Sequence, residues 1–120
     1  MTDEQVLFYE KVNSIYKKST QFAHFYITNS KIILTKHSTW NLFSHVGTGL
    51  AGYLDGENKP LFEFDLSKLK SIKRVRFKLN GKVALFIFED DEIGIAFDSP
   101  KKAIESLKAY IPSSVEIDFN

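Results

Sequence analysis

The stretch "SIKRVRFKLNGKVALFIFEDDEIGIAFDSP", residues 71–100, decides the fold class of this chain. Polar and apolar residues alternate through its first third, which is typical of a strand with one buried face. Asn80–Gly81 is the strongest kind of short hairpin signal, because both turn positions require a positive φ. A second turn is expected at Glu89–Glu92. Three antiparallel strands are therefore predicted, over residues 71–80, 82–89 and 93–98.

A helix signal follows these strands directly. Ser99 suits the N-cap position and Pro100 the first helical position. Apolar residues then recur at helical spacing, at Ala103, Ile104, Leu107, Tyr110 and Ile111. Because Pro112 ends the pattern, the predicted helix spans residues 99–111. The tail after it can form a short strand or fray.

Four more strands are predicted upstream, over residues 6–18, 21–28, 31–37 and 61–66. The first of these segments also fits a helix, but its β-branched and aromatic content favours a strand. The strands follow one another as hairpins, with no strand–helix–strand alternation that would indicate a parallel sheet. The 120 residues suit one domain, 1–120, which we expect to be mainly β with seven strands and one helix.

Four segments together resemble GRAM or bacterial PH-like domains, of the pleckstrin-homology superfold: "DEQVLFYEKVNSIY", "FYITNSKIILTK", "FEFDLSKLKSIKRV" and "VALFIFEDDEIGIAFDSPKKAIESL". The resemblance covers residues 3–111, and its most specific parts are Tyr26–Leu34 and Phe64–Ile72. It departs at Ile32, where the family often has Arg. It implies a seven-stranded antiparallel small barrel or sandwich closed by a C-terminal helix, and a bacterial source. It also implies a non-enzymatic binding or assembly module.

Composition limits the cellular and chemical context. The chain contains no Cys, so disulfides and thiolate metal sites are excluded. The opening "MTDEQ" lacks the features of a signal peptide, and no apolar run is long enough to span a membrane, so a cytoplasmic location is expected. The net charge is only +1, so any electrostatic role must come from local clustering.

Such a cluster lies between Lys68 and Lys82, which holds seven of the 16 basic residues and no acidic one. Alternation places Arg74, Arg76 and Lys78 on one face of the strand and sends Val75, Phe77 and Leu79 inward. This basic stripe can bind lipid phosphates or be only a solvated sheet face. The candidate anionic-ligand residues are Lys73, Arg74, Arg76, Lys78 and Lys82. Nucleic acid is disfavoured, because no aromatic residue is expected on the basic face for stacking.

A Gly-rich apolar insertion, residues 40–56, separates the third and fourth strands. Its "GTGLAG" matches the dinucleotide fingerprint only in letters, because antiparallel strands rather than a helix follow. As a helix, the insertion would present one apolar face made of Trp40, Phe43, Val46, Leu50 and Tyr53. Each internal Gly costs such a helix about 1 kcal/mol, so the insertion needs an apolar partner. That partner can be its own barrel, a second copy or a bilayer.

No pattern in the chain carries recognisable chemistry. The acidic turn at Glu89–Glu92 lacks the spacing of a calcium loop, and His24, His37 and His45 are scattered. We predict no catalytic, cofactor-binding or metal-binding residues. The expected function is a binding module that associates with a protein partner or with itself. The alternative is a peripheral domain at the inner face of the membrane that binds anionic headgroups through the basic strand.

Overall fold

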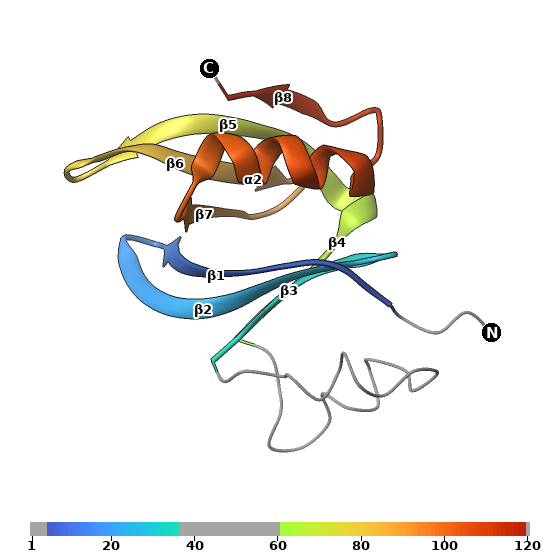
Figure 1. Ribbon diagram of the computed structural model, residues 1–120, viewed down its shortest axis with the longest axis horizontal. Helices are drawn as coiled ribbons and strands as arrows, with labels where there is room; N and C mark the ends of the chain where they lie inside the picture. The colour runs from blue at the N-terminus through green and yellow to red at the C-terminus, as the bar shows by residue number, and fades with distance from the viewer. Residues whose placement is uncertain (1–4, 37–60, 120) are drawn as a thin grey trace.

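The structure is a computed structural model that describes residues 5–36 and 61–119 (Figure 1). Its strands are β1 (Val6–Tyr16), β2 (Ser19–Thr28), β3 (Lys31–Thr35), β4 (Phe62–Asp65), β5 (Leu69–Phe77), β6 (Asn80–Phe88), β7 (Glu92–Phe97) and β8 (Glu116–Asp118). Its helical segments are α2 (Pro100–Leu107) and the short 3₁₀ turns η3 (Leu66–Lys68) and η4 (Lys108–Tyr110). The described chain is thus mainly β, as predicted.

The strands form one sheet in the order β4-β3-β2-β1-β7-β6-β5-β8. All neighbours are antiparallel except β5 and β8, which run parallel. The prediction of seven strands is wrong, because the tail adds an eighth. Alternation within the tail explains the extra strand. Val115 is buried and Ile117 packs against the core, whereas Glu116 and Asp118 are exposed.

The sheet folds over on itself into two layers. In Figure 1, β1, β2 and β3 make one layer and β5, β6 and β7 the other, and β1 pairs with both β2 and β7. The main core cluster holds residues from both layers. Phe25 of one layer contacts Phe86 and Phe97 of the other, with ring centroids 5.6 and 5.4 Å apart. This mutual burial helps to hold the two layers together, beside the backbone pairing of β1 with β7.

The helical segment begins where it was predicted but is less regular. Ser99 is the N-cap residue, although its side chain makes no capping hydrogen bond. The α-helix α2 ends at Leu107 and continues only as η4, so the predicted α-helix over 99–111 is too long. Ala103, Ile104 and Leu107 are buried, and α2 packs on β6 and β7.

The turn between β5 and β6 is not where it was predicted. Phe77 pairs with Asn80, so Lys78 and Leu79 form the turn, and Asn80–Gly81 begin β6. Ile72, which is fully buried opposite Phe86, sets the register of the part of the hairpin in the core, and a register shift between Val75 and Phe77 then brings Phe77 opposite Asn80. A shift in register of one residue would turn Ile72 out to solvent.

Candidate anionic-ligand interface

The β5–β6 hairpin starts in the core and ends in solvent. Along β5, Arg74 follows Ile72 on the same side of the strand, because residues two apart share a face. Ile72 is fully buried, but Arg74 is exposed. The inward row of β5 therefore changes from apolar to basic where the strand leaves the core. The predicted faces are corrected accordingly: Val75 and Phe77 are only half-buried and do not form the core row.

The turn at the end of this hairpin has a defined local structure. Lys78 adopts a φ of 55°, in the left-handed region that non-glycine residues rarely occupy. The Nε–H of Arg76 donates a hydrogen bond to the backbone oxygen of Lys78 over 3.3 Å. The Lys78 ammonium lies 5.3 Å from the centroid of the Phe77 ring. These contacts hold two cations beside the turn.

Leu79 completes the turn and is 95% exposed, although the sequence pattern predicted that it points inward. This apolar residue at the hairpin tip is the functional candidate that the sequence reasoning missed. Of the two turn residues only Lys78 has a positive φ, so the backbone of the turn neither requires nor excludes a leucine at position 79. The signal that could have found it is the register: once Ile72 is paired with Phe86, Leu79 falls in the loop, with or without the shift that brings Phe77 opposite Asn80.

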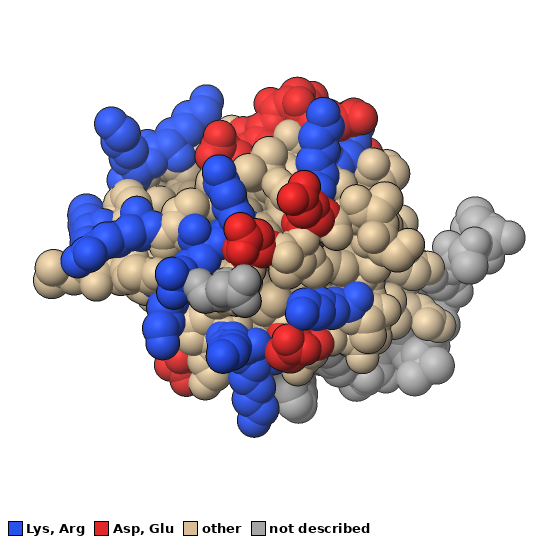
Figure 2. Space-filling model, turned by 90° about the horizontal axis from the view of Figure 1, so that it is seen from above, with Lys and Arg blue, Asp and Glu red and all other residues tan. Residues whose placement is uncertain are grey.

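The predicted basic residues do come together on this hairpin. Lys73, Arg74, Arg76, Lys78 and Lys82 are all exposed. In the part of the chain that the structure describes, none of these five belongs to an ion pair, whereas Lys31 pairs with Glu63 and Lys108 with Glu105. Figure 2 shows Lys and Arg gathered at the end of the molecule where the hairpin lies. Their charge is thus available to a ligand.

A second basic turn lies at the same end. Lys17 and Lys18 connect β1 to β2, both with positive φ (50° and 68°), and both are exposed. Figure 1 places this turn and the β5–β6 turn at the same end of the two layers. Phe22 of β2 and Asn80 of β6 line one groove between the two hairpins. The two turns therefore place exposed basic residues at the same end of the molecule.

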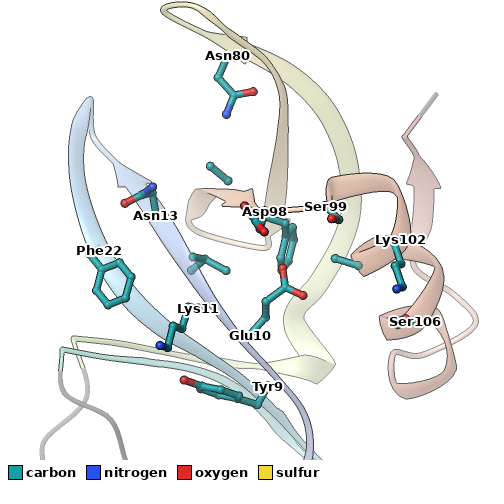
Figure 3. Close-up of a pocket in the computed structure, with 14 residues that line it drawn as sticks. Tyr9, Glu10, Lys11, Asn13, Phe22, Asn80, Asp98, Ser99, Lys102 and Ser106 are labelled. Atoms are coloured by element: carbon teal, nitrogen blue, oxygen red, sulfur yellow. The ribbon is translucent and has the colours of Figure 1, made fainter.

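The groove between the hairpins has a volume of about 820 Å³ and mixed charge (Figure 3). Glu10 and Asp98 lie toward its middle, while Lys11 comes from β1 and Lys102 from α2. Carboxylates in this position would repel an anion, so the exposed cations toward the hairpin tip, rather than the middle of the groove, suit an anionic ligand.

Glu10 is the second residue whose role the sequence did not reveal. Its Oε2 is buried and has no hydrogen-bond partner within the described ranges. Burial raises the pKa of this carboxyl above its ordinary value; the charge of Asp98 adds to the rise, and a backbone hydrogen bond at Asp98 opposes it. A signal was present, because alternation already placed Glu10 in an otherwise apolar row with Phe8 and Val12.

The other predicted residues divide into two groups. His24 is buried, and a 2.7 Å hydrogen bond joins its Nδ1 to Tyr9 Oη. His37, His45 and the proposed contact residues of the insertion (Trp40, Phe43, Val46, Leu50 and Tyr53) lie outside the described residues.

The fold and the site define a mainly β protein with an exposed cationic hairpin at one end. No protein-family model matches this sequence, and no curated protein is similar enough to it to count as a relative. Of the helices in the described ranges, none has the length and apolar character needed to cross a bilayer.

Proposed function

We propose that this protein is a non-enzymatic PH-like binding module that docks on anionic membrane surfaces. Its class is supported by the sequence resemblance to GRAM and bacterial PH-like domains. It is also supported by the order of the described elements: seven antiparallel strands precede α2, which packs on the last two of them. In this proposal β1–β7 and α2 are the PH-like unit, and β8 is an addition to its edge.

The observation that carries the choice of ligand is the set of cations on the β5–β6 hairpin that form no ion pair among the described residues. Each Lys or Arg close to an anionic membrane contributes about 1 kcal/mol of binding free energy. Arg74 and Arg76 can in addition form two parallel hydrogen bonds to a phosphate group. The protein's net charge is only +1, so this attraction depends on where the cations lie rather than on their total.

The test is sedimentation with vesicles of phosphatidylcholine, with and without phosphatidylserine. The protein should sediment only with the anionic vesicles. Arg76→Glu/Lys78→Glu should abolish sedimentation at low salt. Lys68→Glu/Lys70→Glu, which makes the same change in net charge at the opposite end of β5, should bind nearly as wild type. Equal loss in both double variants would contradict docking through the hairpin.

Association with a protein partner or with a second copy was the first expectation from the sequence. It rests on the Gly-rich insertion, residues 40–56, which lies outside the described residues. It stays a prediction, and membrane docking through the hairpin does not depend on it.

A further inference from the structure

Leu79 is the most exposed large apolar side chain in the described part of the chain. Phe22, Tyr110 and Leu7 are 52%, 39% and 37% exposed, whereas Leu79 is 95% exposed. A single exposed leucine is ordinary on a protein surface. This one differs because it is almost fully exposed at the tip of a hairpin whose neighbouring residues include several cations.

Several cations lie close to Leu79 in the hairpin. Lys78 precedes it in the turn, and Arg76 is tied to that turn through the backbone oxygen of Lys78. Lys82 is two residues into the next strand. An apolar tip with Lys and Arg residues beside it suits an anionic membrane surface, where charged headgroups lie above the hydrocarbon. A soluble anion or a nucleic acid would use the cations but leave Leu79 in water.

We propose that Leu79 inserts into the bilayer while the surrounding Lys and Arg residues bind the headgroups. This inference rests on the proposed function, and it names the ligand as a lipid surface rather than a free phosphate. The Lys17–Lys18 turn, at the same end of the molecule, gives the docked domain a second electrostatic contact. Two separated contacts fix the tilt of the domain on the membrane.

Insertion adds a part of the binding free energy that salt does not screen. Raising the salt from about 0.1 to about 1 M shortens the Debye length from about 10 to about 3 Å and weakens the headgroup contacts. Burial of the leucine is unaffected by that screening. Leu79→Ser should therefore weaken partitioning onto anionic vesicles about tenfold, or about 1.4 kcal/mol. It should also leave binding more sensitive to salt than in wild type. Leu7→Ser, at the far end of β1, is the matched control.

A fluorescent reporter tests insertion directly. The chain has no cysteine, so Leu79→Cys and Leu7→Cys can each carry one environment-sensitive dye such as NBD. Anionic vesicles should shift the emission of the dye at position 79 to the blue, and spin-labelled acyl chains should quench it. The dye at position 7 should show neither effect. Soluble inositol phosphate should shift neither dye. Circular dichroism should show that both labelled variants melt as wild type does.

The outcomes separate the two proposals. If wild type sediments with the vesicles but the dye at position 79 neither shifts nor is quenched, insertion is wrong and electrostatic docking stands. Binding of Leu79→Ser equal to that of wild type at high salt would overturn insertion as well. If wild type does not sediment with anionic vesicles at low salt, both proposals fail.

Discussion

Glu10 is an ionisable residue whose carboxyl group the fold partly buries. Because burial raises the pKa of this carboxyl, the folded state holds its proton more tightly than the unfolded state does. Folding is therefore favoured at pH values below the ordinary pKa of 4.5, and this contribution is lost as the pH rises through the higher pKa of the folded state. The carboxylate that results at neutral pH is partly buried, and its Oε2 has no hydrogen-bond partner among the described residues.

The prediction for Glu10 follows from the direction of this pH dependence of stability. Glu10→Gln should raise the free energy of unfolding at neutral pH and should remove the fall in stability that begins near pH 4.5 in wild type. Urea unfolding at a series of pH values measures both effects. Glu92→Gln, at an exposed site on β7, should keep the wild-type profile. A wild-type profile in Glu10→Gln would show that the carboxyl is solvated.

At the scale of elements, β7 packs closely between β1 and β6 because it carries a glycine. A Cβ added to Gly94 would lie 3.1 Å from Val83 Cγ1 and 3.4 Å from Ile15 Cβ. Val83 is 1% exposed, so it has little room to move. Gly94→Ala should therefore destabilise the protein by about 1–3 kcal/mol in urea unfolding. Gly81→Ala is the matched control: nothing lies within 4 Å of its added Cβ, and it should change stability by less than about 0.5 kcal/mol. Equal effects of the two substitutions would contradict this account.

At the scale of the whole molecule, the strand order sets where the sheet is most stable. β1 and β7 lie at the centre of the order, and β1 joins the two layers. β4 and β8 are the edges, with only four and three residues. Native-state hydrogen exchange should be slowest in the paired parts of β1, β6 and β7 and fastest in β8, which can open alone. Slower exchange in β8 than in β1 would show that the parallel pair is not a peripheral addition.

The sequence by itself determined the properties that are local. Alternation located several of the strands, because its two-residue period is a property of a single strand, but it did not give the burial of Val75, Phe77 and Leu79. Ser99 and Pro100 marked the start of the helical segment, because the requirements of a helix N-terminus lie within a few residues. The clustering of cations between Lys68 and Lys82 was also readable, and the structure shows the five candidate residues exposed on one hairpin.

Only the tertiary structure decided the features that depend on pairing. The sequence placed the turn at Asn80–Gly81, where the local preference is strongest. Pairing of the buried Ile72 with Phe86, followed by a register shift between Val75 and Phe77, instead brought Phe77 opposite Asn80, and Leu79 became the tip. In the same way, Glu10 lies on an apolar row in the sequence but lines an open groove beside Asp98 in the fold. The physical reason is common to both: a register and a groove arise from contacts between segments far apart in the chain, and these contacts outweigh the preferences of a two-residue turn.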